Sequence, residues 1–352
     1  MRNRLSVVCV GAALALTAAA TPAAAAAPLA STFRQINLVA DQPGKAAVTD
    51  PHLVNAWGMS LGPNTPLWVS DAETGVSTVY RGAVGTAPVS VVPLVVSIPG
   101  GAPTGQVFND TTDFVVPGTT QPARFIFAGE HGDLSAWNGG TNAVLVAHTA
   151  GAVYKGLALA HTPVGPLLLA ANFHDNRIDV FDRTFKPVVV IGDLFRDPNL
   201  PAGYAPFNVA EIGGRVLVTY ALQDADMEDD VPGAGHGFVD VYTNVGVFVQ
   251  RFVAHGTLNS PWGLAVAPAG FGDLTGALLV GNFGDGRIHA YDLATGRPRG
   301  VLRGPTGGPI RIDGLWGLQV GNAVAGGANS VWFSAGPDDE QHGLLGLLRL
   351  AG

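Results

Sequence analysis

Residues 261–292 read PWGLAVAPAGFGDLTGALLVGNFGDGRIHAYD. An alternating strand begins at Gly263, a continuous apolar strand follows over residues 278–281, and a third strand ends at Tyr291. Gly-containing turns separate the three strands, which is typical of an antiparallel meander. The continuous apolar character of the middle strand indicates burial on both faces. The stretch therefore predicts a small sheet that packs face to face with neighbouring sheets.

The same unit recurs six times along the chain. Its first strand begins at a glycine in five copies and at an asparagine in the fourth, at intervals of 47, 51, 52, 55 and 54 residues: Gly58, Gly105, Gly156, Asn208, Gly263 and Gly317. A fixed period of this length is the signature of a repeat architecture. Because glycine, and next asparagine, tolerates unusual backbone angles, we expect this position to adopt such angles.

The fold class that follows is all-β, a six-bladed β-propeller with four-stranded blades. A fourth, irregular strand completes five copies, whereas the sixth copy has only three. Residues 33–39 alternate ahead of the first copy, and their pairing with residues 344–350 would close the ring and remove two exposed edges. We expect one domain over residues 28–352, with blades at about 50–100, 101–150, 151–199, 200–254, 255–308 and 309–352 plus 33–39.

Residues 1–27 have the composition of a cleaved secretory signal peptide. Two arginines precede an apolar run over residues 5–20, and an Ala-rich tract after Pro22 offers cleavage sites. A membrane anchor is the alternative, but the run is shorter than the roughly 20 residues that cross a bilayer. We expect a secreted, extracellular protein that does not insert into a membrane after cleavage. Cys9, the only cysteine, lies in this segment, so the mature chain would contain no thiol.

The charge balance argues against nucleic acid as a partner. The chain has 19 Lys and Arg against 27 Asp and Glu, a net charge of −8, and no basic stripe that could follow a phosphate backbone. We expect a monomer whose partner is a small molecule, a glycan or a protein.

Sequence position sorts the loops of a propeller by face. The turns between second and third strands lie at the same end of the sheets as the starts of the first strands, and here these turns are acidic and rich in histidine. Candidates for acid-base catalysis in these turns are Glu130, His131, His174 and His236. The alternative is that turns are polar in any case, since Asp and Asn bond locally to the backbone.

The longest of these turns, residues 223–237, is strongly acidic. Its carboxylates are Asp224, Asp226, Glu228, Asp229 and Asp230. Oxygen ligands at alternating positions suit Ca²⁺, which takes six to eight of them, and another divalent metal is the variant of this hypothesis. Two alternatives stay open: a solvated acidic lid, or a catalytic carboxylate.

An aromatic residue precedes the repeated glycine or asparagine in four copies, as in Trp57, Trp262 and Trp316. Packing around the axis is the simplest interpretation. The functional alternative is a ligand-binding funnel with polar groups around it. The third copy has Lys155 instead, a candidate anchor for an anion or a partner in a salt bridge with a neighbouring acid. The ligand-binding candidates are Asn55, Trp57, Asn109, Lys155, Asn172, Asn208, Trp262, Asn282, Asp313 and Trp316.

The sequence resembles a family of uncharacterised secreted bacterial six-bladed β-propeller proteins. The resemblance spans nearly the whole mature chain and rests on Asn37-Leu-Val-Ala-Asp41, Thr49-Asp-Pro-His-Leu-Val-Asn-Ala-Trp-Gly58, Val107-Phe-Asn109, Phe125-Ile-Phe-Ala-Gly-Glu130, Ser135-Ala-Trp-Asn138, Ala171-Asn-Phe173 and Gly281-Asn-Phe-Gly-Asp-Gly286. It implies fold and export and transfers no catalytic residue. More distantly, the chain resembles NHL-repeat and gluconolactonase-like propellers, some of which hold a divalent metal with Glu, Asn and Asp. Only Asn55, Asn208 and Asp313 match such positions in part.

Two functions from different classes follow from these observations. We expect a binding propeller that holds a ligand or partner at its acidic, His-bearing upper face, because no Gly-x-Ser-x-Gly, phosphate-loop or His-Glu-x-x-His motif occurs. The alternative is a metal-dependent hydrolase or lyase of the lactonase-like propeller type. A structural role in the cell envelope is the third possibility.

Overall fold

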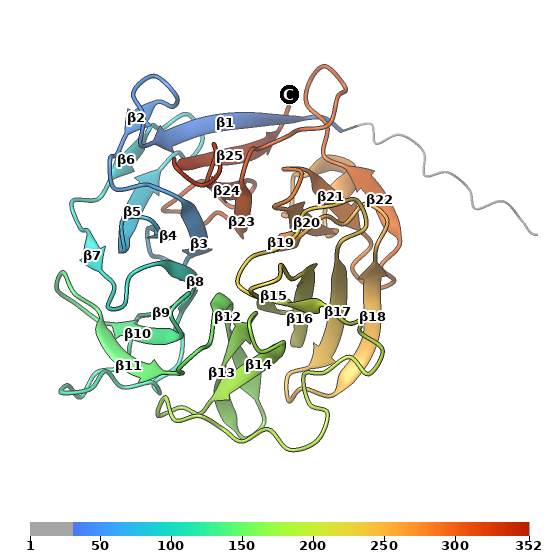
Figure 1. The fold of residues 1–352 in the computed structure, drawn as a ribbon. Coiled ribbons are helices and arrows are strands. Elements are labelled where there is room, and N and C mark those ends of the chain that lie inside the picture. The colour runs from blue at the N-terminus through green and yellow to red at the C-terminus, as the bar shows by residue number, and fades with distance from the viewer. Residues whose placement is uncertain (1–30, 352) are drawn as a thin grey trace, which may run out of the picture.

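The strands form six sheets arranged as a ring around a central axis (Figure 1). A computed structural model of the chain describes residues 31–351, and all structural statements concern these residues. The predicted six-bladed propeller is confirmed. Residues 31–351 contain no helix with the length and hydrophobicity needed to span a bilayer. The predicted signal peptide, with Cys9, lies outside the described residues.

Each blade runs from an inner strand at the axis to an outer strand at the rim. Blade 1 contains β3 (Ala56–Ser60), β4 (Leu67–Asp71), β5 (Val76–Gly82), β6 (Val89–Val91) and β7 (Val96–Ser97). Blade 2 contains β8 (Pro103–Phe108), β9 (Phe125–Gly129), β10 (Asp133–Trp137) and β11 (Val144–His148). Blade 3 contains β12 (Tyr154–Thr162), β13 (Gly165–Asn172) and β14 (Arg177–Phe181), beside which an outer segment pairs through the isolated bridge of Phe181 with Pro187.

The remaining blades repeat this order. Blade 4 contains β15 (Tyr204–Ile212), β16 (Arg215–Leu222), β17 (Phe238–Thr243) and β18 (Phe248–Ala254). Blade 5 contains β19 (Pro261–Val266), η1 (Gly272–Leu274), β20 (Leu278–Asn282), β21 (Ile288–Tyr291) and β22 (Pro298–Val301). Blade 6 contains β23 (Leu315–Val320), β24 (Val331–Ala335), β25 (Leu344–Leu350), β1 (Phe33–Ala40) and β2 (Val48–Thr49).

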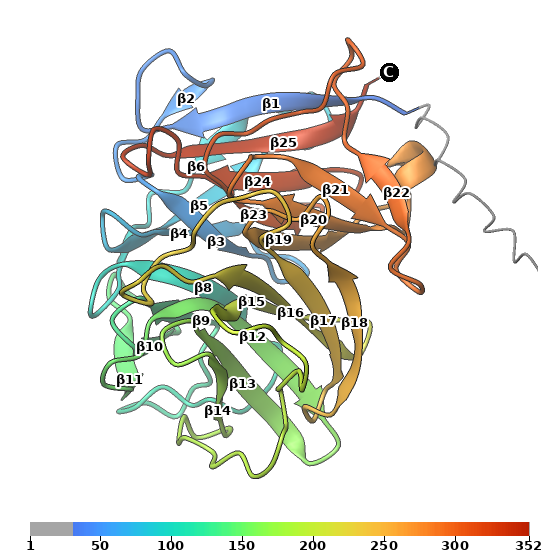
Figure 2. The same cartoon turned by 45° about the vertical axis from the view of Figure 1, so that its right-hand side comes forward.

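Blade 6 closes the ring with strands from both ends of the described chain. β1 pairs antiparallel with β25, and Phe33 stands opposite Leu350. Figures 1 and 2 show the blue β1 lying along the red β25. The predicted pairing of residues 33–39 with residues 344–350 is therefore confirmed. It hydrogen-bonds two strand edges that would otherwise be free.

Four of the six second strands are buried from end to end, as their continuous apolar character predicts. Every residue of β4, β9, β20 and β24 is buried. Each of these strands lies between two neighbouring blades, so both of its faces are covered. This burial of apolar surface supplies most of the stability of the ring.

The repeated glycine is needed because neighbouring blades approach each other closely there. It does not adopt an unusual backbone angle. None of Gly58, Gly105, Gly156, Gly263 and Gly317 has a positive φ, so the expectation from backbone tolerance was wrong. A Cβ at Gly58 would overlap the Thr104 carbonyl oxygen, and one at Gly105 would overlap the backbone of Leu157. At Gly263 a Cβ would lie 2.7 Å from the Trp316 carbonyl oxygen. Each inner strand thus packs directly on the backbone of the next.

Asn208 takes the place of the repeated glycine in blade 4 and contacts the next blade through its side chain. Its side-chain amide donates a hydrogen bond to the Trp262 carbonyl oxygen of blade 5 at 2.8 Å. The asparagine, which also has no positive φ, therefore replaces a close backbone contact with a hydrogen bond across the blade interface. The ring of contacts between inner strands is continuous through all six blades.

All six inner strands are irregular at this position. The pairing with the second strand shifts register beside the repeated glycine or asparagine in every blade. A bulge re-aims the side chain at which it occurs. The residues at these shifts are Trp57, Thr104, Lys155, Phe207, Trp262 and Trp316. The repeat thus contributes one bulged residue per blade, and these residues define the centre of the molecule.

We predict that Gly105→Ala destabilises the protein by about 1–3 kcal/mol, because its methyl group would overlap backbone that cannot move without shifting a blade. Chemical denaturation measures the free energy of unfolding. The matched control is Gly139→Ala, since Gly139 has no positive φ and open space where the Cβ would lie. Equal stability of the two variants would contradict the close-approach explanation.

Candidate functional site

An aromatic plug occupies the axis of the ring. Trp57 and Trp316 are stacked with ring centroids 3.6 Å apart, and Trp262 meets Trp57 edge-on at 6.5 Å. Blades 1 and 5 are not neighbours, so only the axis can bring Trp57 and Trp262 into contact. The plug is completed by Phe173, Phe207 and Phe283. Trp57 and Trp316 are each 1% exposed, which favours the packing interpretation of these tryptophans over a ligand-facing funnel.

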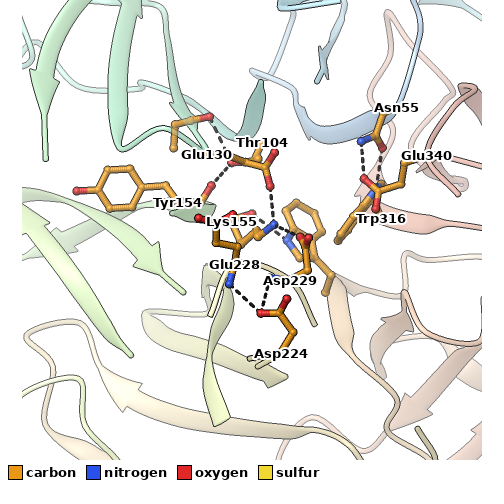
Figure 3. Close-up of polar contacts among 12 residues, drawn as sticks. Asn55, Thr104, Glu130, Tyr154, Lys155, Asp224, Glu228, Asp229, Trp316 and Glu340 are labelled. Atoms are coloured by element: carbon orange, nitrogen blue, oxygen red, sulfur yellow. Dashed lines mark hydrogen bonds and ion pairs between the residues drawn. The ribbon is translucent and has the colours of Figure 1, made fainter. Parts of the chain in front are cut away.

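Lys155 lies directly above this plug, on the upper face where the inner strands begin. Its Nζ is 2.5 Å from Glu130 Oε1 and 3.0 Å from Asp229 Oδ1, and it lies 5.3 Å from the centroid of the Trp57 ring (Figure 3). Glu130 comes from the second-to-third turn of blade 2, and Asp229 from the long acidic turn of blade 4. The sequence offered two interpretations of Lys155, an anchor for an anion or a salt bridge with a neighbouring acid. The structure shows the salt bridges.

The charge of Lys155 is fixed by these two carboxylates. Burial alone would lower the pKa of this ammonium group, whose side chain is only 3% exposed. The attraction of Glu130, followed by that of Asp229, outweighs burial and raises the pKa above its usual value. Lys155 is thus a permanent cation and hydrogen-bond donor at the centre of the upper face.

A second polar group reaches the same centre from blades 1 and 6. Trp316 Nε1 donates to Asn55 Oδ1 at 2.9 Å, and Asn55 Nδ2 donates to Glu340 Oε2 at 2.6 Å (Figure 3). Burial, with smaller contributions from Glu130 and Asp229, raises the pKa of Glu340 to about 7, against the lowering effects of the Asn55 bond and of Lys155. Glu340 therefore belongs electrostatically to the Lys155 cluster.

A cavity of about 440 Å³ opens beside this cluster on the upper face. Its size is within the range of small-molecule sites. The polar side chains that line it come from three blades, and the lining residues are Glu130, His131, Gly151, Ala152, Val153, Lys155, Glu228 and Asp229. The structure thus brings together two catalytic candidates, Glu130 and His131, two metal candidates, Glu228 and Asp229, and the ligand candidate Lys155. We call these five residues the upper site.

Several other sequence candidates are engaged in local turns and do not line this cavity. Asn172 is fully buried and donates to Asp175 and Asp179, and Asn282 is fully buried and donates to the Thr257 carbonyl oxygen and Asp285. His174 contacts the neighbouring Asp175, and His236 contacts the Val231 carbonyl oxygen. These contacts are the local bonding that the alternative interpretation of polar turns expects.

Three further candidates lie elsewhere. Asn109 follows β8, whose end is on the lower face, and its amide donates to the carbonyl oxygens of Asp113 and Ala123. The placement of Asn109 beside the aromatic residues was therefore wrong, because the residue comes after the inner strand and not before it. Asp313 lines a separate upper-face cavity of about 440 Å³ near β1 and β25. Asn208 lines a cavity on the axis of the ring, on the opposite side of the aromatic plug from Lys155.

The acidic turn does not gather its carboxylates into one ligand shell. Asp224 accepts hydrogen bonds from the backbone N–H groups of Glu228 and Asp229, and Asp229 turns to Lys155. Burial raises the pKa of Asp230 to about 6, and Asp226 is exposed. Residues 31–351 contain no group of three or more His, Cys, Asp or Glu side chains arranged to hold a metal ion. Calcium, or another divalent metal, stays a prediction from the sequence.

Glu340 is the residue of the cluster that sequence reasoning did not select. It lies in the second-to-third turn of blade 6, the turn that corresponds to that of Glu130 in blade 2. This shared position in the repeat was the sequence signal that could have placed Glu340 near Glu130. Its contact with Asn55 joins residues 285 positions apart, so no local pattern could reveal it.

The fold and the upper site define a six-bladed β-propeller with an ion-pair cluster around a buried lysine at one end of its axis. The chain is 34% identical over 330 residues to an uncharacterized protein of Acanthamoeba polyphaga mimivirus, covering 90% of this chain and 80% of the viral protein. A second uncharacterized protein of the same virus is 32% identical over 337 residues, covering 90% of this chain and 86% of its own length. The chain belongs to the family of these viral proteins. No known family model matches it.

Solved structures resemble the chain in fold alone. Virginiamycin B lyase from Staphylococcus aureus superposes with a TM-score of 0.53 at 11% sequence identity, covering 91% of this chain and 99% of the lyase. A streptogramin B lyase superposes with a TM-score of 0.50 at 10% sequence identity, covering 91% of this chain and 97% of the lyase. The relatives in sequence are viral, so the bacterial origin and the secretion expected from the sequence stay predictions.

We predict opposite shifts of the Glu340 pKa in two variants. Lys155→Met removes the cation that lowers this pKa and raises it above about 7, whereas Glu130→Gln removes an anion that raises it and moves it below about 7. Carboxyl-carbon NMR titration measures both values. The control Glu73→Gln changes an exposed acid in the corresponding turn of blade 1 and leaves the Glu340 pKa where it is. Shifts in the same direction would show that Glu340 is not coupled to the cluster.

Proposed function

We propose that the protein binds a polyhydroxylated ligand, a sugar or polyol, in the upper site. One observation supports this most directly: Lys155 is held between Glu130 and Asp229 at the wall of the 440 Å³ cavity. The cluster offers an ammonium donor and carboxylate acceptors side by side. Adjacent hydroxyl groups, each both a donor and an acceptor, match this arrangement.

The ion pair holds Lys155 and Glu130 in place before any ligand arrives. Lys155 is nearly fully buried, and Glu130 is 28% exposed at its side chain, so both are fixed while part of the carboxylate faces the cavity. Hydrogen bonds to charged groups are stronger than those between neutral groups. A ligand that bonds to groups already in place loses less affinity to ordering of the protein.

The state of Lys155 supports binding in preference to covalent chemistry. Its raised pKa keeps it as an ammonium ion, which lacks the lone pair of an amine nucleophile. Glu130 is occupied by its ion pair with that ammonium group. The cluster therefore acts as a set of fixed donors and acceptors.

The metal-dependent hydrolase or lyase stays the alternative from the sequence. The chain resembles solved lyases in fold alone. In the acidic turn, Asp224 and Asp229 are engaged in contacts within the protein. Metal analysis of the purified protein, with lactone and ester assays in the presence and absence of a chelator, tests this alternative. Stoichiometric metal together with chelator-sensitive turnover would favour it over simple binding.

We predict that a panel of mono- and disaccharides and polyols, screened by saturation-transfer NMR, contains ligands whose affinity depends on the ion pairs. Glu130→Gln and Lys155→Met each weaken binding about tenfold or more by calorimetry, because each removes a charge-assisted hydrogen bond. Asp226→Asn, an exposed acid in the same turn as Asp229, is the matched control and keeps the affinity. If no compound of the panel binds, or if Asp226→Asn weakens binding equally, the proposal fails.

A further inference from the structure

The lower half of the central channel is a second cavity, separate from the upper site. It has a volume of about 400 Å³ and is lined by the inner strands of all six blades. Asn208 and Trp262 are among its lining residues, so its inner end reaches the aromatic plug. It shares no lining residue with the cavity beside Lys155. Each end of the axis therefore carries its own cavity.

The lower cavity has polar and apolar lining surface in similar shares. Residues that follow the repeated glycine or asparagine on five inner strands contribute its aliphatic and thioether side chains: Met59, Leu157, Leu159, Val209, Leu264 and Leu318. Beside these side chains water finds few hydrogen-bond partners, so an apolar group that displaces the water there binds favourably. The wall thus suits the apolar body of a ligand.

The rim carries the only ionisable side chains among the residues that line the lower cavity. They are Asp110, His161 and Glu211, from the ends of the inner strands of three consecutive blades. His161 Nδ1 lies 2.5 Å from Glu211 Oε2, and His161 Nε2 lies 2.9 Å from Asp110 Oδ1. The backbone N–H of His161 also donates to Glu211. One imidazole thus bridges two carboxylates across the blade interfaces.

The rim has an excess of negative charge. Because a carboxylate accepts from each ring nitrogen, Glu211 first and then Asp110 raise the pKa of His161 and favour its doubly protonated form. Two carboxylates and one imidazolium leave a net charge of −1, which becomes −2 when His161 loses its proton. Neither Lys nor Arg is among the lining residues.

Gln106, one of the polar residues of the lining together with Ser60, Asn208 and Gln319, also offers an acceptor. Gln106 is 5% exposed and lines the wall, and its Nε2 donates to the carbonyl oxygens of Gly58 and Trp68. Its Oε1 is buried without a hydrogen-bond partner among the described residues. A buried acceptor without a partner calls for a donor. Rim and wall therefore both favour a ligand that donates hydrogen bonds and carries positive charge.

We propose that the lower half of the channel binds an organic ammonium ion, with its apolar chain against the wall and its ammonium group between Asp110 and Glu211. Asp110 is 54% exposed at its side chain and Glu211 is 14% exposed, so one carboxylate can swing to the ligand while the other stays fixed. The ligand competes with the His161 imidazolium for the two carboxylates.

The probe that tests this site is hexylammonium chloride, compared with hexanol and hexanoate of the same chain length. By calorimetry, hexylammonium binds about tenfold or more tightly than hexanol, and hexanoate does not bind. NMR shifts of the Leu157, Leu264 and Leu318 methyl groups locate the bound probe in the lower cavity. Equal binding of hexylammonium and hexanol, or no binding of either, overturns the proposal.

Two rim variants distinguish the contribution of the rim charge to binding from that of the cavity itself. Asp110→Asn and Glu211→Gln each weaken hexylammonium binding about tenfold and leave hexanol binding unchanged, because they remove charge and keep the side-chain volume. The exposed Asp110 is the safer variant for folding. Asp193→Asn, an exposed acid that does not line the cavity, is the matched control and keeps the affinity. A loss of affinity in the control equal to that in Asp110→Asn overturns the proposal.

The imidazole gives the site a pH dependence of known sign. As the pH rises and His161 loses its proton, the competitor for Asp110 and Glu211 disappears, so hexylammonium affinity rises until the amine itself deprotonates. His161→Gln abolishes this rise, and a fall in affinity over the same range overturns the proposal. Saccharide binding in the upper site is unaffected by all three rim variants, so the two proposals fail independently.

Discussion

The whole molecule depends on the direct contact between neighbouring inner strands at one position of each repeat. Because Gly58, Gly105, Gly156, Gly263 and Gly317 have no Cβ, neighbouring chain segments approach them closely, and Asn208 spans the remaining interface with its amide. Because this contact sets how closely six sheets approach the axis, it also sets the size of the central space. A bulge beside each contact then turns one side chain per blade into that space.

The identities of those six side chains divide the channel into two compartments of different chemistry. Tryptophan and phenylalanine side chains pack together in the middle and separate the two compartments. Lys155, the only charged member, draws Glu130 and Asp229 over the plug and makes the upper compartment ionic. Below the plug the inner strands present aliphatic residues, and charge returns only at the rim, where Asp110, His161 and Glu211 connect blades 2, 3 and 4.

The sequence predicted the features that repeat and missed those that occur once. Blade number and ring closure followed from periodicity, because every copy uses the same buried strands. The ion pairs of Lys155 were foreseen as one alternative, since a buried ammonium ion needs an anion. Asn172 and Asn282 were indistinguishable in sequence from residues that face a ligand, although each amide donates to an aspartate of its own turn. Asn55–Glu340 and Asp110–His161–Glu211 join separate blades, and only the assembled ring brings such residues into contact.

Pairing of β1 with β25 has a consequence for how the protein reaches its native state. Phe33 and Leu350 are neighbours in space although about 300 residues separate them, so this ladder closes a loop of nearly the whole described chain. High contact order of this kind slows folding. Until that ladder forms, five blades can assemble in order while the sixth presents unpaired edges to other chains. Aggregation during synthesis and refolding should therefore depend on how quickly the two ends of the chain find each other.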